Sequence, residues 1–334
     1  MSSGKGNEIT VMKKAIQTIP LSKIDLTDET FSVNFMPDVE RLSSSIRQIG
    51  QIQPVFLRPK GDRYQIICGF RRVWIARDLG HSEIDARITQ EADELRLFLM
   101  SLHENVTTRG FNTVEVATAL AKLVHHFNVD PANVIEIFLP LFSQETNEKI
   151  LNTFLSLARM EEDVKTYVLR GKVSRTNIRL LATFPEADRN AIVPLVSPLK
   201  LTESRLREIL SLLSEISRKD QRPVSEVIAA PEIQDVLHHP ELTFSQKSEK
   251  IKGVLMKLRY PRMHALEESF EKKRKMLNLP SSVSVHHSPY FEGKGLRVKF
   301  DIETLEQYEA VLSSLSFLAK DEAFQGMLIP QKKP

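Results

Sequence analysis

The spacing of apolar residues changes twice along the chain, and each change marks a different kind of structure. Residues 84–88 alternate apolar and polar side chains, as in a strand with one buried face. Leu42 and Ile46 instead lie at the spacing of one helical face. We therefore expect residues 16–105 to form a compact α+β unit. Its predicted elements are a helix at 39–49, strands at 53–58, 64–68 and 84–88, and helices at 71–79 and 91–104.

From Asn112 the pattern becomes helical almost without interruption. Asn112 and Glu115 have the spacing of a capping box, and an apolar run follows from Val114. This pattern predicts a series of short helices. They are expected at 132–142, 146–158, 161–170, 175–183, 187–196 and 203–217, with a further helical stretch at 224–278 that prolines 231, 240 and 261 interrupt.

The last part of the chain alternates again before a final helix. Residues 283–285 and 296–300 alternate as two strands, and a helix is predicted from about residue 302. Two strands and one helix in about 50 residues bury little surface by themselves. We therefore expect this part to be stabilised by pairing with a second copy of the chain.

Composition narrows the class of protein without identifying a partner. The chain has 334 residues, with 46 Lys or Arg against 43 Asp or Glu, and its net charge of +3 neither requires nor excludes nucleic acid. Its single cysteine, Cys68, rules out an intramolecular disulfide and a multi-cysteine zinc site. Apolar runs are shorter than the ~20 residues of a membrane span, and the first residues carry no secretory signal. We expect a cytoplasmic protein that does not enter a membrane.

A strand–glycine–helix junction at 67–72 is the best candidate for binding chemistry. Gly69 would let a ligand approach the backbone, and the helix after it would offer free N–H groups. Arg71 and Arg72 could hold a di- or triphosphate through paired hydrogen bonds. Such junctions are also common as purely structural features, so the motif alone leaves both interpretations open.

Two further segments are less specific in isolation. Glu104 and Asn105, at a predicted helix end, offer the oxygen ligands that suit Mg²⁺ on phosphates, although such pairs also occur by chance. Residues 50–58 predict a helix cap, a turn and a strand, which is a structural role. Cys68 precedes Gly69 at a strand end and is interpreted as buried packing.

In this order and at this spacing, the segments resemble the ParB chromosome- and plasmid-partition family. The resemblance is carried first by 42–58, 69–72 and 104–105, which match its N-terminal domain. Residues 171–174 and the next helix are similar to its central helical domain, and 277–315 to its small C-terminal dimerisation domain. The resemblance covers most of the chain in the family's domain order.

The resemblance implies that the N-terminal domain binds CTP with Mg²⁺ and that the nucleotide closes the protein around DNA as a sliding clamp. Glu104 and Asn105 would help to bind the Mg²⁺ that the phosphates hold. Any CTP hydrolysis would be slow. The residues that the resemblance assigns to the nucleotide are Gly69, Phe70, Arg71, Arg72, Gln53, Arg58, Glu104 and Asn105.

Three departures from the family pattern concern this site. Phe70 stands where the family has glutamate, Thr107 and Thr108 replace a Gln-Arg pair, and residues 31–35 replace an early Asn-Pro-x-Gln-Pro-Arg stretch. We expect phosphate binding to survive these changes. Hydrolysis and selectivity for CTP are the properties that the changes put in question.

The family's helix-turn-helix would fall near 131–158, with a recognition helix at about 146–157. Lys149 is accompanied there by Glu145 and Glu148, although phosphate contacts need Lys or Arg. DNA recognition and a structural helix pair are therefore both open for this segment. The residues that we expect to contact DNA are Asn147, Lys149, Asn152, Arg175 and Arg179.

The main concentration of basic residues lies later, at 247–275. This basic stretch holds ten Lys or Arg against four Glu. It could supply sequence-independent, salt-sensitive attraction to DNA, or it could be a solvated helical face.

The expected fold class is α+β multidomain, with a small mixed α/β ParB-like nucleotide-binding domain, an all-α helix-turn-helix-type middle and a small ββα dimerisation domain. The predicted domains are a flexible tail at 1–15, the ParB-like domain at 16–111, a helical domain at 112–220, a helical linker region at 221–279, the dimerisation domain at 280–320 and a tail at 321–334. The residues expected in the dimer contact are Val298, Phe300, Leu305, Tyr308, Leu312 and Leu315.

Three functions are open at this level. The first is a CTP-gated, nucleoid-associated DNA-binding homodimer in chromosome or plasmid segregation, whose segment 1–14 contacts a ParA-type ATPase. The second is a divergent paralogue that binds CTP but acts as an adaptor or transcriptional regulator without site-specific DNA binding. The third is a phosphotransferase or CTPase in which turnover is the purpose.

Overall fold

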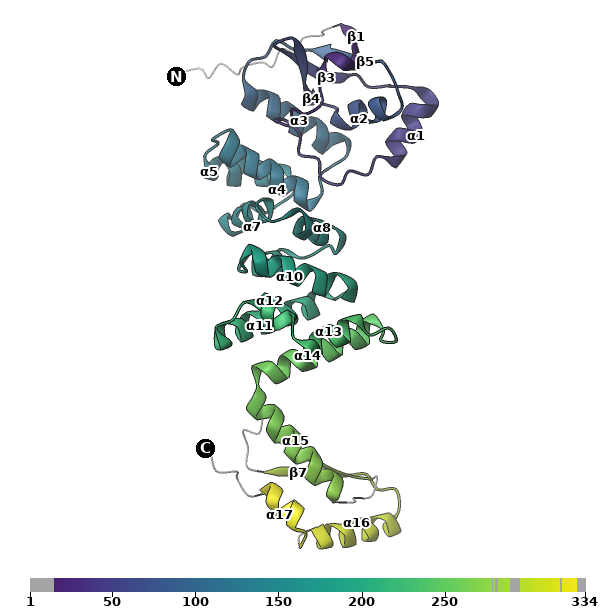
Figure 1. Cartoon of the computed structure of the whole chain (residues 1–334), viewed down its shortest axis with the longest axis vertical. Helices are drawn as coiled ribbons and strands as arrows, with labels where there is room; N and C mark the ends of the chain where they lie inside the picture. Colours follow the sequence, from purple (N-terminus) through teal and green to yellow (C-terminus); the bar gives the residue numbers. More distant parts are fainter. Residues whose placement is uncertain (1–14, 278, 280–281, 289–294, 319, 329–334) are drawn as a thin grey trace, which may run out of the picture. The chain divides into compact units, whose positions relative to one another are not determined.

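The computed structural model describes residues 15–277, 279, 282–288, 295–318 and 320–328. These residues form two compact units, one up to residue 197 and one from residue 198 on (Figure 1). The division falls inside the predicted helical domain 112–220, and the predicted domain boundaries stay predictions. The segment 1–14, which we expect to contact a ParA-type ATPase, lies outside the described residues.

A five-stranded sheet organises the first unit, in the order β1-β5-β3-β4-β2. The strands are β1 (Ile16–Pro20), β2 (Ile24–Asp25), β3 (Val55–Lys60), β4 (Arg63–Cys68) and β5 (Glu83–Ile88). β3 is antiparallel to β4 and parallel to β5, so the three predicted strands form the centre of the sheet. The two edge strands were not predicted, because β1 buries only Ile19 and β2 has only two residues.

Two helices pack against this sheet, and a third packs against one of them. They are α1 (Glu40–Ile49), α2 (Phe70–Asp78) and α3 (Glu94–Thr108). α2 contacts β3 and β5, and α3 contacts β4 (Figure 1). Val55 and Ile66, at the centre of the sheet, are fully buried. α1 buries only Ile46 and leaves Ile49 66% exposed, although the apolar spacing predicted one buried face.

The rest of the first unit is helical, as the sequence predicted. Its α-helices are α4 (Thr113–Ala121), α5 (Pro131–Asn133), α6 (Leu139–Leu141), α7 (Glu148–Ala158), α8 (Glu162–Arg170), α9 (Arg175–Ala182) and α10 (Glu186–Val196). Two π-helical turns, η2 (Lys122–His126) and η3 (Val134–Phe138), lie among them. η3 interrupts the continuous helix predicted at 132–142. Pro140 explains the change, since its nitrogen cannot donate the regular helical hydrogen bond to residue 136.

Lys122 in η2 ties the helical part to an early loop. Its ammonium group donates to the main-chain carbonyls of Glu29, Thr30 and Ser32 at 2.5, 3.0 and 2.7 Å. The ring of Phe127 stacks on the buried ring of Phe31 in this loop and also on the ring of Phe98. The 29–32 loop is thus held in place by one cation and an aromatic cluster.

The second unit begins with helices and ends with a strand pair and two helices. Its elements are α11 (Glu203–Asp220), α12 (Val224–Ile228), α13 (Pro231–His238), α14 (Phe244–Arg259), α15 (Pro261–Met276), β6 (Val283–His287), β7 (Leu296–Phe300), α16 (Leu305–Leu318) and α17 (Glu322–Leu328). β6 and β7 are antiparallel, with Val283 opposite Phe300. α17 lies within the segment predicted as a tail at 321–334 and packs against α15.

The coarse fold class is therefore confirmed as a mixed α/β part followed by a mostly helical remainder. Within the described ranges, we find no helix with the length and apolar character needed to cross a bilayer.

Candidate functional site

The junction between β4 and α2 has the geometry that the sequence predicted. Gly69 caps α2 with a φ of 96°, a left-handed conformation that glycine adopts without strain. A Cβ atom at this position would lie only 2.8 Å from the Cγ1 atom of Val55. The chain therefore passes β3 too closely for any side chain at position 69.

Arg72 joins three of the predicted site segments. Its Nη1 donates to the main-chain carbonyls of Gln53 and Pro54 at 3.0 and 3.1 Å, and its Nη2 pairs with the Glu104 carboxylate at 2.9 Å. Gln53 thus takes part through its backbone. The predicted group of Gln53, Gly69, Arg72 and Glu104 does lie together in space.

Arg71 turns away from Arg72 toward a second carboxylate. Its Nε donates to the Asn34 side chain at 2.9 Å, and its Nη2 pairs with Glu115 Oε1 at 2.9 Å. The Glu115 side chain is only 1% exposed and also pairs through Oε2 with Arg109 at 2.8 Å. Burial lowers the pKa of Arg71, and the nearby charge of Arg109 lowers this pKa further. The two arginines therefore flank one buried carboxylate.

The same arrangement fixes the predicted ligand Asn105. Its side-chain amide donates to the Ser101 carbonyl at 2.8 Å, and its Oδ1 accepts from the Nε of Arg109 at 2.7 Å. Arg109 also lies over the ring of Phe111, 4.9 Å from the centroid. Asn105 is consequently linked to Arg71 through Arg109 and Glu115.

Two residues of the motif belong to the core. Phe70 is 5% exposed and packs against Trp74 with ring centroids 6.1 Å apart, so its side chain faces the interior. Cys68 is also buried, and burial raises the pKa of its thiol to about 12, with a further contribution from the negative charge of Glu104. A protonated, enclosed thiol fits the packing role predicted for Cys68.

Arg58 lies in a different cluster from the residues around Gly69. Its Nε donates to Gln65 Oε1 at 2.6 Å, and its Nη2 pairs with Glu94. Gln65 in turn donates to Asp28 at 2.7 Å. Burial would raise the pKa of Asp28, but hydrogen bonds from Lys60 and other neighbours outweigh it and hold this pKa below its usual range. The structure does not bring Arg58 into contact with Arg71 or Arg72.

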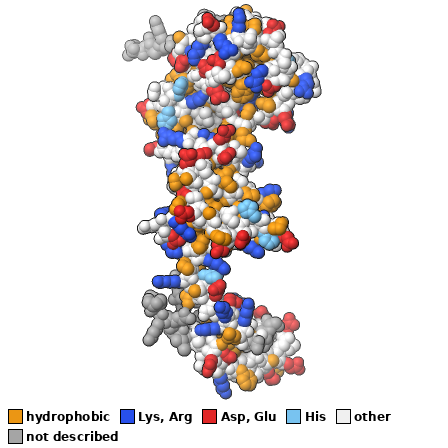
Figure 2. All heavy atoms as spheres, in the orientation of Figure 1, with side chains coloured by type: hydrophobic (Ala, Val, Ile, Leu, Met, Phe, Trp, Pro, Cys, Tyr) orange, Lys and Arg blue, Asp and Glu red, His pale blue; other side chains and the backbone are white. Residues whose placement is uncertain are grey.

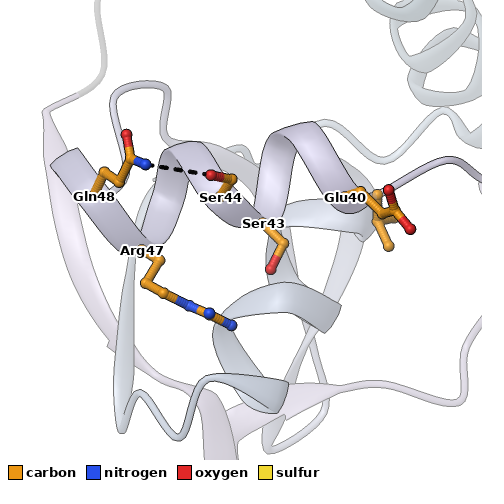
Figure 3. Close-up of a pocket in the computed structure, with 6 residues that line it drawn as sticks. Glu40, Ser43, Ser44, Arg47 and Gln48 are labelled. Carbon is orange, nitrogen blue, oxygen red and sulfur yellow. Dashed lines mark hydrogen bonds between the residues drawn. The ribbon is translucent and has the colours of Figure 1, made fainter.

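A hollow of about 450 Å³ lies along α1 but contains none of the predicted site residues. Figure 3 shows that its labelled lining residues come from this one helix, with Gln48 bonded to Ser44 at 3.4 Å. A surface formed by a single helix has few polar groups that point toward the same ligand. We therefore place the candidate site at the start of α2 and not at this hollow.

The predicted DNA-contacting residues divide between α7 and α9, which pack against each other. Lys149 and Asn152 are exposed on α7, and Asn147 is exposed directly before it. The Asn147 side chain caps the helix by accepting from the Lys149 N–H at 2.8 Å. Arg175, at the start of α9, donates to the Gln144 side chain at 2.9 Å, and Arg179 donates to Thr176 at 3.2 Å.

The basic stretch at 247–275 forms α14, α15 and the turn between them. Several of its cations are already bonded within the second unit. Lys252 pairs with Glu208 and Arg259 with Glu215, each at 2.7 Å. Figure 2 likewise shows Lys and Arg side chains interspersed with acidic ones on the face that it draws. The effective charge of this stretch is therefore smaller than its sequence count.

The residues expected in the dimer contact are exposed or half-buried. On α16, Leu305, Tyr308 and Leu312 are 72%, 38% and 43% exposed, and Phe300 at the end of β7 is 37% exposed. Of the residues of α16, only Val311 and Leu318 are buried among the side chains that the structure describes. An apolar face of this helix is thus open to a partner.

Sequence reasoning missed three residues of the network at α2, namely Asn34, Arg109 and Glu115. The capping-box spacing did mark Glu115, and its capping bond to the Asn112 N–H is present at 3.1 Å. Its pairing with two arginines had no local signal, because Arg71 is distant in sequence. Arg109 follows the Thr107-Thr108 pair that replaces the family's Gln-Arg.

Comparison with known proteins gives consistent matches. The profile of the ParB N-terminal domain family matches residues 6–106. A probable chromosome-partitioning protein ParB of Coxiella burnetii is 28% identical over 201 residues, or 60% of this chain and 66% of that protein. Its counterpart in Campylobacter jejuni is 25% identical over 188 residues, or 56% of this chain and 64% of that protein. The chain thus spans slightly less than two thirds of the length of these relatives.

A solved structure also matches in part. It is the crystal structure of a C-terminally truncated chromosome-partitioning protein ParB from Caulobacter crescentus complexed with CTP-γ-S. The match has a TM-score of 0.26 at 22% identity and covers 54% of this chain and 97% of that one. A score this low does not establish a common arrangement of the two chains.

Proposed function

Because residues 6–106 match the profile of the ParB N-terminal domain family, we propose that this chain is a CTP-dependent DNA-binding protein of chromosome or plasmid partition. The observation that carries the proposal is the convergence of Gly69, Arg72 and Glu104 at the start of α2, where the resemblance puts the triphosphate. The similarity to a probable chromosome-partitioning protein of Coxiella burnetii supports the biological role.

The start of α2 suits an anion for reasons independent of the resemblance. The first helical bond runs from the Val73 N–H to the Gly69 carbonyl, so the N–H groups before Val73 have no intrahelical acceptor. These groups and the helix dipole favour negative charge just before the helix. Arg71 and Arg72 add two guanidinium groups that suit the geometry of phosphate oxygens.

Mg²⁺ fits this site only together with the phosphates. The described residues contain no group of three or more His, Cys, Asp or Glu side chains that could hold a metal ion alone. Glu104 fits as a ligand, because its carboxylate is 32% exposed and pairs with Arg72 through Oε1. Asn105 fits less well, since its Oδ1 accepts from the cationic Arg109. Mg²⁺ would neutralise phosphate charge there, with Glu104 as the protein ligand.

The route from the nucleotide to the helical part would run through the start of α4. Asn112 caps α4 and also donates from its side chain to the Phe35 carbonyl at 3.0 Å. Glu115, in the first turn of the same helix, pairs with Arg71 of α2. Since α4 packs against α7, a nucleotide that draws on Arg71 would act on the segment proposed to contact DNA.

For DNA contact we propose the exposed residues of α7 together with Arg175 and Arg179. One observation favours the second candidate function, an adaptor or regulator that binds CTP without site-specific DNA binding. α7 presents Glu148 beside Lys149, and Asn147 uses its side chain as a helix cap. A helix whose polar side chains are used in this way has few groups left to recognise DNA bases. Attraction to DNA by the basic stretch is compatible with either function.

We further propose that the protein is a homodimer, joined through the exposed apolar face of α16. Such a face costs free energy in water and is typical of a contact surface. The family resemblance supports a nucleoid-associated protein with a ParA-type ATPase as partner.

Three measurements test the function. Calorimetric titration with CTP, ATP and GTP in the presence of Mg²⁺ should give binding with CTP and little or none with the purine nucleotides. Selection from random duplex DNA should then enrich a short inverted repeat. Enrichment without any common sequence would favour the adaptor, and no binding of any nucleotide would refute the proposal. Phosphate release faster than about one per second would favour the enzyme hypothesis.

A further inference from the structure

We propose that Arg109 is a third phosphate-binding arginine of the nucleotide site and that the buried Glu115 positions both Arg109 and Arg71. The inference rests on the proposed nucleotide-binding function. It adds to that function two residues that the sequence did not assign to it.

Arg109 reaches the site because α3 ends just before it. Its main chain, with φ of −140° and ψ of −17°, leaves the helical path, and its side chain turns back along α3. Nε then donates to Asn105 Oδ1 at 2.7 Å and Nη1 to Glu115 Oε2 at 2.8 Å. The ring of Phe111 supports the guanidinium plane from one side. Four contacts, including the Gly110 carbonyl at 2.9 Å, thus fix its direction.

Glu115 acts as a support behind the two arginines. Its Oε1 pairs with Arg71 and its Oε2 with Arg109, and the carboxylate is 1% exposed. The side chains of Arg71 and Arg109 are 18% and 19% exposed, so both are more accessible to solvent than the carboxylate that they share. A carboxylate held behind two surface guanidinium groups orients them without blocking an anion from outside.

Unused hydrogen-bond donors of the cluster are available to such an anion. Arg71, Arg72 and Arg109 face Glu104 and Glu115, and Asp38 also lies close enough for its charge to act on Arg71, so cations and carboxylates balance. A guanidinium group has five N–H donors, and the bonds of Arg71 to described residues use only Nε and Nη2. Those of Arg109 use Nε and Nη1. Donors are therefore left on both groups for phosphate oxygens.

The position of Arg109 also compensates for a departure in the sequence. The resemblance expects an arginine at position 108, where Thr108 donates its hydroxyl to the Glu104 carbonyl at 2.8 Å and so contributes no charge. The end of α3 then brings the guanidinium group of the next residue toward Glu115. We infer that one residue takes over the charge that its neighbour lacks.

Calorimetric titration of the full chain with CTP and Mg²⁺ tests this role at several salt concentrations. Arg109→Ala should weaken CTP binding about tenfold or more, as expected for loss of charge-assisted hydrogen bonds. Its affinity should also vary less steeply with salt, because one charged contact with the phosphates is lost. A merely structural role for Arg109 would not change this salt dependence. Arg109→Lys keeps the charge, loses the paired geometry and should bind with intermediate affinity.

Arg96→Ala is the matched control, since Arg96 lies on the same helix and is 53% exposed in a pair with Glu91. Its CTP affinity and salt dependence should equal those of the wild type. The positioning role of Glu115 is tested by a double-mutant cycle. The loss caused by Arg109→Ala should shrink at least threefold when Glu115→Gln is already present, because Arg109 is then no longer held in place.

The outcomes separate this inference from the proposed function. A wild type that binds no nucleotide would overturn both. A wild type that binds CTP, with Arg109→Ala and Arg109→Lys unchanged in affinity and salt dependence, would overturn only the role of Arg109. If Arg109→Ala weakens CTP binding equally with and without Glu115→Gln, Glu115 is not the positioning residue. Should Arg109→Ala fail to fold, Arg109→Lys alone decides, since its thermal unfolding and CTP affinity are measured on the same sample.

Discussion

Replacing Gly69 by alanine would test how tightly the junction before α2 is built. At a φ of 96° an alanine has a strained backbone, which costs about 1–2 kcal/mol. Its Cβ would also lie 2.8 Å from Val55 Cγ1 and 3.1 Å from the Arg72 guanidinium. Val55 is fully buried in a central strand and cannot move aside, so overpacking should cost about 1–3 kcal/mol more. The expected loss in free energy of unfolding is about 2–5 kcal/mol.

Gly80→Ala provides the matched control at the other end of α2. Its φ of 76° gives a similar backbone cost, but a Cβ there meets no atom of the structure within 4 Å. This variant should lose only about 1–2 kcal/mol. The difference between the two variants therefore isolates the close approach of the chain to β3.

Urea unfolding is the assay, followed by fluorescence of Trp74. This residue is the only tryptophan of the chain and lies in α2 itself, so its signal reports on the first unit. The midpoint should fall further for Gly69→Ala than for Gly80→Ala at an unchanged slope. If the two losses agree within about 0.5 kcal/mol, the contact with Val55 does not constrain the junction and the reasoning is refuted.

Three further predictions follow from the contacts described. Arg72→Ala should weaken CTP binding at least tenfold in calorimetry, because charge-assisted hydrogen bonds to the triphosphate are lost. Arg77→Ala, which changes an exposed arginine of the same helix, should leave the CTP affinity unchanged. Equal CTP affinities of the two variants would place the phosphates elsewhere. Burial lowers the pKa of Lys122 from 10.5 to about 8, so the unfolded chain binds more protons than the folded one between these pH values. In urea titrations, the free energy of unfolding should therefore rise with pH across this window relative to Lys122→Met. Parallel pH profiles of the two proteins would contradict this. Leu312→Asp should halve the molecular mass measured by sedimentation equilibrium, whereas Ala310→Asp, on the opposite side of α16, should leave the protein a dimer. A Leu312→Asp protein that is still dimeric would exclude this face as the dimer contact.

Local sequence signals predicted the elements that position the site. The strands predicted at 53–58, 64–68 and 84–88 correspond to β3, β4 and β5, because such patterns depend on near neighbours in the chain. The capping box of α4 was likewise predicted from Asn112 and Glu115 alone. Gly69 was recognised as the end of a strand, and its left-handed backbone agrees with that interpretation.

The contacts of the charged side chains could not be predicted in the same way. Arg58 was expected beside the nucleotide, but its partners are Gln65 of β4 and Glu94 at the start of α3. Glu115 was predicted as a helix cap. Its ion pair with Arg71 depends on the fold, which brings these two distant residues together. Pairing between distant elements leaves no periodic trace in a sequence, which is why the elements were predicted better than the network.

The buried thiol of Cys68 has a practical consequence for studying this protein. With a pKa of about 12, only about one thiol in 10⁵ is ionised at pH 7, and thiolate is the form that reacts with maleimides and disulfides. As Cys68 is also the only cysteine of the chain, the natural protein should behave toward such reagents almost as if it had none. A cysteine introduced on α16 or beside α2 could therefore carry a cross-linker or a dye without any background from the native sequence.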